Sequence, residues 1–189
     1  MNASRQNLQH KPFLTPIWLT VIAGFAAFAV ALLCAWVWFT ASSTTVIVIR
    51  HAEKETVTAT DPPLSPAGEA RAELLARMFG ERQVPGRLDG IYVSDTLRSR
   101  STAAPLASRL GISPIVAPND DSKRLANRVL SENRGKRVLI VGHINTVPDI
   151  VAALSGQGDI PKMDDKDYGV MYIVTVPRIG RATVLRLNY

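Results

Sequence analysis

The stretch Thr45-Val46-Ile47-Val48-Ile49-Arg50-His51-Ala52-Glu53 decides the fold and most of the function that the sequence predicts. Its first five residues are β-branched, which is typical of a strand buried on both faces of a sheet. An arginine and a histidine follow directly, where this strand is expected to end. A guanidinium can hold phosphate oxygens while a neutral imidazole nitrogen attacks phosphorus, so the pair predicts phosphoryl chemistry.

The composition is that of one folded domain. The chain has 189 residues, of which 47% are hydrophobic and 20% charged. Its formal net charge is +6, but the Lys and Arg residues are scattered in runs no longer than two. This pattern favours an anion-attracting surface and argues against a nucleic-acid partner. The single cysteine, Cys34, lies in the apolar amino-terminal segment, which excludes a disulfide within the folded domain.

An apolar segment near the amino terminus predicts a membrane-spanning helix. No Asp, Glu, Lys or Arg occurs between Lys11 and Arg50, and the stretch from Ile17 to Phe39 is almost wholly apolar and long enough to cross a bilayer. Tryptophans near both ends suit the two membrane interfaces. Arg5 and Lys11 place basic charge in the short stretch before the segment, so the positive-inside rule places that side in the cytoplasm.

The predicted organisation is a cytoplasmic tail (1–12), a transmembrane signal-anchor helix (13–40) and a soluble domain (44–189). The protein would cross the inner (plasma) membrane once, with the domain extracytoplasmic, or periplasmic in a bacterium. A cleaved signal peptide is the alternative, but it usually has a shorter apolar core and a small-x-small cleavage site. Phe39-Thr40-Ala41 has a large residue three before the cut, and Ala31-Leu32-Leu33-Cys34 lacks the small residue before a lipidated cysteine. We therefore favour an uncleaved anchor.

Strand and helix patterns alternate through the domain, which is typical of a parallel-rich α/β sheet. The predicted strands are 45–49, 90–93 and 137–141, and the predicted helices are 66–79, 99–110 and 146–154. The runs 170–176 and 182–187 predict a closing hairpin, which would make the sheet mixed. Residues 117–122 are interpreted as a turn.

Two of the three histidines follow predicted buried strands. His51 follows the first strand and His143 follows the strand 137–141, whereas His10 lies in the basic tail. Ligands of open α/β sheets bind beyond the carboxyl ends of the strands. Either histidine alone would more often be structural, but the pair predicts a shared site.

Four ordered segments resemble the histidine phosphatase superfamily, the phosphoglycerate mutase-like proteins. They are Arg50-His51-Ala52-Glu53, Leu64-Ser65-Pro66-Ala67-Gly68-Glu69-Ala70, Ser94-Asp95-Thr96-Leu97-Arg98-Ser99-Arg100-Ser101-Thr102-Ala103 and Val141-Gly142-His143-Ile144-Asn145-Thr146. The resemblance implies a three-layer α/β/α fold with a mostly parallel mixed sheet. It also implies a phosphatase that works without metal or cofactor, through a phosphohistidine intermediate.

The resemblance assigns the catalytic roles residue by residue. It implies that His51 is the nucleophile and that Arg50, Arg98 and His143 donate to the phosphate oxygens, where negative charge is spread during transfer. Arg100 lies two residues beyond Arg98 on a helix and so faces roughly the opposite side, which predicts a surface charge.

Four further residues have open roles. Glu53 could orient a site arginine, bind substrate or pair with Lys54 or another surface charge. Asn145 could donate to phosphate or cap the following helix. The proton donor to the leaving alcohol could be Asp120 or Asp121, although a helix N-cap is the role we favour there.

Other kinds of site are disfavoured. The domain has only two histidines, and Asp164-Asp165-Lys166-Asp167 lacks the spacing of a calcium loop and is interpreted as a solvated turn. No Gly-rich phosphate loop occurs, so nucleotide hydrolysis through a P-loop is not supported.

The expected partners are a phosphorylated small molecule or glycan and, through the apolar helix, a membrane. The short stretch after Arg98 leaves little chain for a lid, which favours a phosphatase over a mutase. Glycolytic substrates are absent outside the cytoplasm, which also argues against a mutase. An envelope phosphosugar is the leading substrate class. Protein phosphohistidine and a non-catalytic phospho-ligand binding module are the alternatives.

Overall fold

The computed structural model describes residues 17–56, 60–80, 87–118 and 120–189. The chain divides into two compact units, with the boundary between Thr40 and Ala41. The expected cytoplasmic tail, residues 1–12, and its His10 lie outside the described residues.

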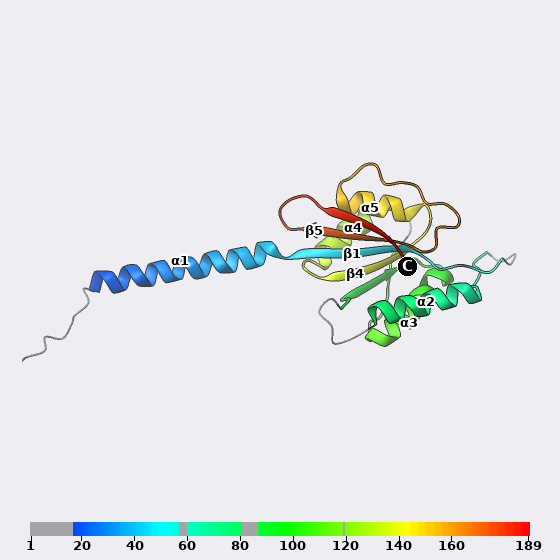
Figure 1. Ribbon diagram of the computed structural model, residues 1–189, viewed down its shortest axis with the longest axis horizontal. Coiled ribbons are helices and arrows are strands. Elements are labelled where there is room, and N and C mark those ends of the chain that lie inside the picture. The colour runs from blue at the N-terminus through cyan, green and yellow to red at the C-terminus, as the bar shows by residue number, and fades with distance from the viewer. Residues whose placement is uncertain (1–16, 57–59, 81–86, 119) are drawn as a thin grey trace, which may run out of the picture. The chain divides into compact units, whose positions relative to one another are not determined.

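Helix α1, Ile17–Ala41, lies in the first unit except for its last residue. In the described part of the chain, Ile17–Trp38 is the one helix long and apolar enough to cross a membrane by length and composition, and none of its most apolar window is buried (Figure 1). A membrane anchor and a signal sequence both fit these properties. The predicted apolar helix is therefore present, and the choice between anchor and cleaved signal stays a prediction.

The second unit is built on a six-stranded sheet in the order β3-β2-β4-β1-β5-β6 (Figure 1). The strands are β1 (Ser43–Arg50), β2 (Gly90–Val93), β3 (Ile115–Val116), β4 (Arg137–Gly142), β5 (Val170–Pro177) and β6 (Thr183–Asn188). Strands β1, β2, β3 and β4 pair in parallel, whereas β5 is antiparallel to both β1 and β6. The predicted mixed sheet with a closing hairpin is confirmed.

Helices cover both faces of the sheet. They are α2 (Pro66–Phe79), α3 (Leu97–Leu110), α4 (Ser122–Glu132) and α5 (Thr146–Ser155). Along β1, Val46 and Val48 pack in one core with α4 and α5, while Ile47 and Ile49 pack in the other with α2 and α3. Because successive side chains of a strand point to opposite faces, a strand covered on both sides reads as a continuous apolar run. The three-layer α/β/α arrangement is thus confirmed.

The two elements between α3 and β4, namely β3 and α4, were not predicted from the sequence. Strand β3 is only two residues long, and both are exposed. Helix α4 is largely polar, and only Ala126 and Val129 in it are fully buried, so its apolar stripe is narrow. The predicted turn over 117–122 runs into the start of α4, where the Asp121 side chain accepts a hydrogen bond from the backbone N–H of Arg124 (2.8 Å).

The register between β1 and β4 brings the two histidines to one edge of the sheet. Arg50 is aligned with Gly142, and the backbone N–H of His51 donates to the Gly142 carbonyl oxygen (2.9 Å). His51 and His143 therefore follow aligned residues of adjacent parallel strands. This is the carboxyl edge at which α/β proteins bind ligands.

Helix α2 starts in close contact with the chain that follows His51. Ser65 caps the helix by accepting from the backbone N–H of Gly68, and its own backbone N–H donates to the Glu53 carbonyl oxygen (3.0 Å). A Cβ atom on Gly68 would overlap that same carbonyl oxygen. The Leu-Ser-Pro-Ala-Gly segment therefore needs glycine at this position so that α2 can approach the loop.

Candidate active site

The His51 side chain is 4% exposed and both of its ring nitrogens have a partner. Nδ1 lies 2.8 Å from the carbonyl oxygen of Ala52, and Nε2 accepts a 3.2 Å hydrogen bond from Nε of Arg98. A carbonyl can only accept and an arginine Nε–H can only donate, so the proton is on Nδ1 and the lone pair is on Nε2. The backbone thus holds the ring in the tautomer that a nucleophile at Nε2 requires.

Burial lowers the pKa of His51 to about 4. The hydrogen bond to Ala52 raises the pKa, but the positive charges of His143, Arg98 and Arg50 lower it further. The free site therefore keeps this imidazole neutral at pH 7, which leaves the Nε2 lone pair available for attack.

His143 lies beside His51 and is 7% exposed. The two ring centroids are 5.1 Å apart, with the planes inclined by 65°. Nε2 of His143 is 2.9 Å from the Ser94 hydroxyl, and the His143 backbone N–H donates to the Thr146 hydroxyl (2.9 Å). Burial, and then the charge of Arg98, lower the pKa of His143 to about 4, while Asp95 opposes this shift.

A hydroxyl network anchors His143 to the end of β2. Ser94 directly follows β2 and donates a 2.7 Å hydrogen bond to the hydroxyl of Ser99, which is fully buried in α3. The Thr96 hydroxyl caps α3 and lies 3.0 Å from Ser94. Since Ser94 gives its proton to Ser99, it accepts from Nε2 of His143 in this arrangement.

Arg98 is the second residue of α3, and contacts on both sides fix its position. Nη1 of Arg98 donates to Oδ1 of Asp61 (3.1 Å), and Oδ2 of Asp61 accepts from the backbone N–H of Leu97 (2.7 Å). One turn later, the Thr102 hydroxyl donates to the Arg98 carbonyl oxygen (2.7 Å) and accepts from the backbone N–H of Ala52 (2.9 Å). Helix α3 is thereby tied to the residue that follows the nucleophile.

Arg50 is 5% exposed and is held by the segment before β5. Its Nη1 donates to the carbonyl oxygens of Asp164 (3.2 Å) and Asp165 (2.9 Å), and its Cζ lies 3.9 Å from the centroid of the Tyr168 ring. Burial lowers the pKa of Arg50, and Tyr168 and the nearby carboxylates oppose that shift. Nε of Arg50 is buried and has no protein partner among the described residues. A buried donor in this state is suited to an anionic ligand.

The residues 164–167 were predicted to form a solvated turn. The side chains of Asp164, Asp165 and Lys166 are indeed exposed. Their sequence, however, does not reveal that two of the carbonyl oxygens bind a buried arginine far away in the chain. The turn therefore belongs to the wall of the site.

Glu53 pairs with helix α2 and not with Lys54. Both of its carboxylate oxygens accept from Nε of Arg71 (3.0 and 2.9 Å), and Nη2 of Arg71 adds a 2.6 Å contact. Burial would raise the pKa of Glu53, but the hydrogen bonds and charge of Arg71 outweigh it and lower the pKa. Nη1 of Arg71 also donates to the Tyr189 carbonyl oxygen (2.9 Å). A role of Glu53 in substrate binding stays a prediction.

The side chain of Asn145 makes no capping hydrogen bond at the start of α5, and the residue is exposed. The alternative of a helix cap is therefore wrong, and Thr146 holds this turn instead. Donation from Asn145 to phosphate stays a prediction. Arg100 is exposed, as expected for a surface charge.

In the described residues, no hydrogen bond or ion pair joins the acid candidates Asp120 and Asp121 to either histidine. They follow β3, which is three strands from β1, a lateral separation of roughly 14 Å at about 4.8 Å per strand. Asp121 caps α4, and both carboxylates lie within 4.0 Å of the Arg124 guanidinium. The favoured N-cap role is confirmed for Asp121, and the structure offers no support for either residue as the acid.

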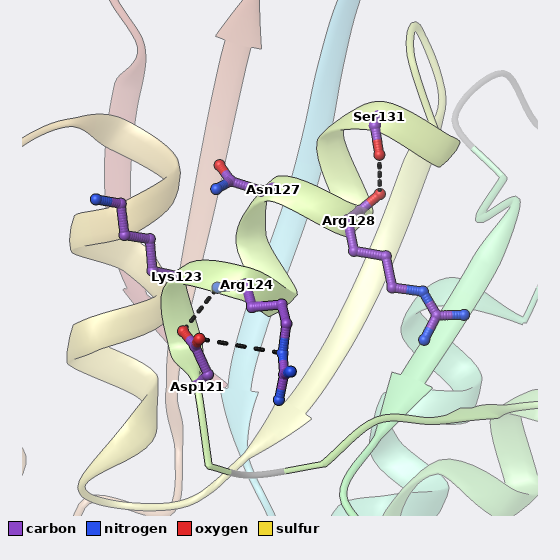
Figure 2. Close-up of a pocket in the computed structure, with 6 residues that line it drawn as sticks. All are labelled: Asp121, Lys123, Arg124, Asn127, Arg128 and Ser131. Atoms are coloured by element: carbon purple, nitrogen blue, oxygen red, sulfur yellow. Dashed lines mark hydrogen bonds and ion pairs between the residues drawn. The ribbon is translucent and has the colours of Figure 1, made fainter.

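Figure 2 shows Asp121 bonded to Arg124 at the rim of a surface hollow on α4. The hollow is lined by Asp121, Lys123, Arg124, Asn127, Arg128 and Ser131. Its lining includes neither histidine, and its arginines are paired with Asp120, Asp121 and Glu132. The hollow is therefore separate from the site described above.

Sequence reasoning named the four groups at the centre of the site but missed their supports. Ser94 and Thr102 lie inside one of the family-like segments, yet only Arg98 was assigned a role in it. Asp61 and Tyr168 carry no motif signal, because each reaches the site from a loop whose path depends on the whole fold. In the described ranges, no group of three or more His, Cys, Asp or Glu residues is placed to hold a metal ion.

The arrangement is suited to binding a phosphate group over a neutral imidazole. Two guanidinium groups and a second imidazole lie around His51. The guanidinium groups can donate to phosphate oxygens, and the imidazole can do so when it is protonated. Such donors, fixed in advance around the reacting atom, stabilise the charge of a transferring phosphoryl group.

Comparisons with known proteins point the same way. The family described as histidine phosphatase superfamily (branch 1) matches residues 46–119, which include Arg50, His51 and Arg98. A sequence comparison with curated proteins gives no significant match.

Two solved structures share the fold. The protein histidine phosphatase SixA, complexed with tungstate, is 22% identical with a TM-score of 0.63, and the match covers 76% of this chain and 96% of that one. A mycobacterial glucosyl-3-phosphoglycerate phosphatase is 16% identical with a TM-score of 0.60, and the match covers 77% of this chain and 99% of that one. At these identities the likeness shows the fold.

Proposed function

We propose that this chain, whose residues 46–119 match the model of the histidine phosphatase superfamily, is a metal-independent phosphatase that hydrolyses phosphomonoesters through a phosphohistidine on His51. The observation that carries this proposal is the pair of hydrogen bonds on the His51 ring. The Ala52 carbonyl fixes the proton on Nδ1, and Arg98 points its Nε–H at the Nε2 lone pair. The neutral imidazole of His51 and the phosphate-binding guanidinium of Arg98 are thus in contact at Nε2 of His51.

The reaction has two steps. In the first, the Nε2–phosphorus bond forms and the bond from phosphorus to the leaving oxygen breaks, which releases an alcohol. In the second, water attacks phosphorus, the nitrogen–phosphorus bond breaks and inorganic phosphate leaves. Arg98 and the unpartnered Nε of Arg50 donate to the phosphate oxygens in both steps. The bound anion also favours the protonated form of His143, which then becomes a further donor.

The proposed substrate is an extracytoplasmic phosphorylated small molecule or glycan, such as an envelope phosphosugar. The apolar helix α1 near the amino terminus, with basic residues before it, supports a single-pass anchor in the inner (plasma) membrane and a domain outside the cytoplasm. The structural likeness to a phosphatase of glucosyl-3-phosphoglycerate supports the substrate class.

A second candidate substrate is protein phosphohistidine, which the likeness to SixA favours. Two assays separate the candidates, one with a sugar phosphate and one with a phosphohistidine-bearing protein. A preference for the phosphoprotein would replace the phosphosugar proposal. A topology reporter fused after Tyr189 tests the location, and a cytoplasmic reporter signal would also favour the phosphoprotein.

The mechanism is tested on the full chain in detergent with p-nitrophenyl phosphate, a good leaving group. We expect turnover and a trapped phosphohistidine that is absent in His51→Ala. Arg100→Ala, which changes an exposed arginine on the same helix as Arg98, is the matched control and should keep both signals. If the wild-type chain binds phosphate but neither turns over nor traps a phosphoenzyme, the protein is a phospho-ligand binding module.

A further inference from the structure

The proposed reaction lacks one group, the acid that protonates the leaving alcohol. Alkoxide is a poor leaving group, so a carboxylic acid at the leaving oxygen usually contributes two to four orders of magnitude in rate. The two carboxylates expected to supply it, Asp120 and Asp121, are engaged with Arg124 beside an edge strand. The acid must therefore be sought nearer to His51.

Asp61 is a carboxylate in direct contact with the phosphate-binding apparatus. Its Oδ1 accepts from Nη1 of Arg98 at 3.1 Å, and Nε of the same guanidinium donates to Nε2 of His51 at 3.2 Å. One planar guanidinium therefore bridges the carboxylate and the nucleophile. The charge of Asp61 also acts on His143, the second imidazole of the site.

The position of Asp61 suits the exit path of the leaving group. In a phosphoryl transfer the leaving oxygen departs in line with the attacking atom, on the far side of phosphorus. His51 is buried at 4% exposure, so a phosphate over its Nε2 directs its ester oxygen toward solvent. The Asp61 side chain is 42% exposed and lies beside Arg98, so solvent and a leaving alcohol can both reach it.

We propose that Asp61 is the proton donor to the leaving alcohol, an inference that rests on the phosphatase function proposed above. As Nε2 of His51 bonds to phosphorus, the ester P–O bond breaks and the Asp61 carboxyl gives its proton to the departing oxygen. In the second step the Asp61 carboxylate takes a proton from the attacking water, which restores the acid. Phosphate and neutral His51 are the remaining products.

Binding of substrate would also change the partner of this carboxyl. In the free site Oδ1 of Asp61 is bonded to Nη1 of Arg98. When a phosphate group arrives, the Arg98 donors turn toward its oxygens, which releases Oδ1 of Asp61 for the leaving group. The backbone N–H of Leu97 still holds Oδ2 of Asp61 in place.

Asp95 is the rival carboxylate and serves as the matched control. It is exposed, it directly follows Ser94, and its charge raises the pKa of His143. In the described part of the chain no hydrogen bond joins it to Arg98 or His51, in contrast to Asp61. If Asp95 acts only through its charge and transfers no proton, its removal should change the rate by the same factor for any leaving group.

The test compares Asp61→Asn and Asp95→Asn in the full chain on two substrates, p-nitrophenyl phosphate and glycerol 2-phosphate. p-Nitrophenolate leaves without an acid, whereas the alkoxide of glycerol does not. We expect Asp61→Asn to lower kcat/KM at least about 100-fold on glycerol 2-phosphate and less than about 10-fold on the aryl ester. Asp95→Asn should change both rates by the same factor.

In Asp61→Asn the asparagine side chain keeps an oxygen that can accept from the backbone N–H of Leu97 or from Arg98. Asp61→Glu keeps a carboxylic acid and should therefore retain more alkyl ester activity than Asp61→Asn. An equal fall on both substrates in Asp61→Asn would show that Asp61 only positions Arg98 and would overturn the proposal. Selective loss of alkyl ester activity in Asp95→Asn would overturn it too. A wild-type chain inactive on both esters would instead reject the phosphatase function itself.

Discussion

Nε of Arg98 donates a 3.2 Å hydrogen bond to Nε2 of His51, the atom proposed to attack phosphorus. In the free site the arginine therefore occupies the place that the phosphate group must enter. When substrate binds, the hydrogen bond from Arg98 to His51 is replaced by bonds from the guanidinium to the phosphate oxygens. Arg98 thus changes its partner from the nucleophile to the phosphate group and stays in the site. The planar fork of arginine suits this exchange, because it presents several N–H donors in a fixed geometry that matches phosphate oxygens.

Arg98→Lys should lower kcat/KM for p-nitrophenyl phosphate by about 100-fold, the scale of losing one fixed donor to the transition state. A lysine ammonium is a single point charge and cannot contact both His51 and Asp61 as the guanidinium does. Arg100→Lys, on the same helix but exposed, should stay within about two-fold, because the Arg100 side chain has no hydrogen bond or ion pair with a site residue in the described part of the chain. Equal effects of the two changes in steady-state kinetics would contradict the role of Arg98.

The stability of the domain should fall as the pH drops from 6.5 toward 4. Burial lowers the pKa of His51 and of His143 to about 4. Below pH 6.5 the unfolded chain therefore binds more protons than the folded chain, which favours unfolding. The free energy of unfolding is at its full value above pH 6.5. By pH 4, protonation of each imidazole lowers it by roughly 3 kcal/mol. Urea unfolding at pH 7, 5.5 and 4.5 measures this slope.

His143→Gln is the comparison for that experiment, since glutamine does not titrate. The variant should lose stability less steeply over the same pH range than the wild type. Parallel slopes for the two proteins would mean that His143 is not held neutral by burial. The measurements should be made without phosphate, because a bound anion favours the protonated imidazole.

Gly68→Ala should destabilise the domain by about 1 to 3 kcal/mol, the usual range for overpacking. The added methyl group would overlap the Glu53 carbonyl oxygen, which is backbone and cannot turn away. Gly158→Ala is the control, because a Cβ there meets nothing within 4 Å. Denaturant unfolding should separate the two variants. A Gly68→Ala domain as stable as the control would show that α2 can shift away from this loop.

Tyr168→Ala should raise KM for phosphate esters, whereas Tyr168→Phe should change it little. The ring lies 3.9 Å from Cζ of Arg50 and forms one wall beside His51. A phenyl ring keeps the packing and the cation–π contact, which alanine removes. Steady-state kinetics and inhibition by inorganic phosphate measure the effect. Equal KM values for the alanine variant and the wild type would show that the carbonyl oxygens of Asp164 and Asp165 suffice to hold Arg50.

The fold could be predicted wherever one strand or helix carried its own pattern. The apolar run before Arg50 and the one before His143 each identified a buried strand, and parallel pairing then placed both histidines at one edge. Helix α4 was missed because its buried face is narrow. The supports of the site were missed for another reason: Asp61 and Tyr168 act through contacts across the fold, and such contacts leave no periodicity in the sequence.

The bond between Arg50 and the Asp165 carbonyl oxygen joins residues 115 positions apart in the chain. Contacts of this span form late in folding, because the long loop between them must close first. At a synthesis rate of about 5 to 20 residues per second, Asp165 is made at least several seconds after Arg50. A partly made chain therefore carries His51 and Arg50 without the carbonyl oxygens that hold Arg50 in place. We expect recovery of activity during refolding to report the pairing of β5 with β1 and not the formation of the helices.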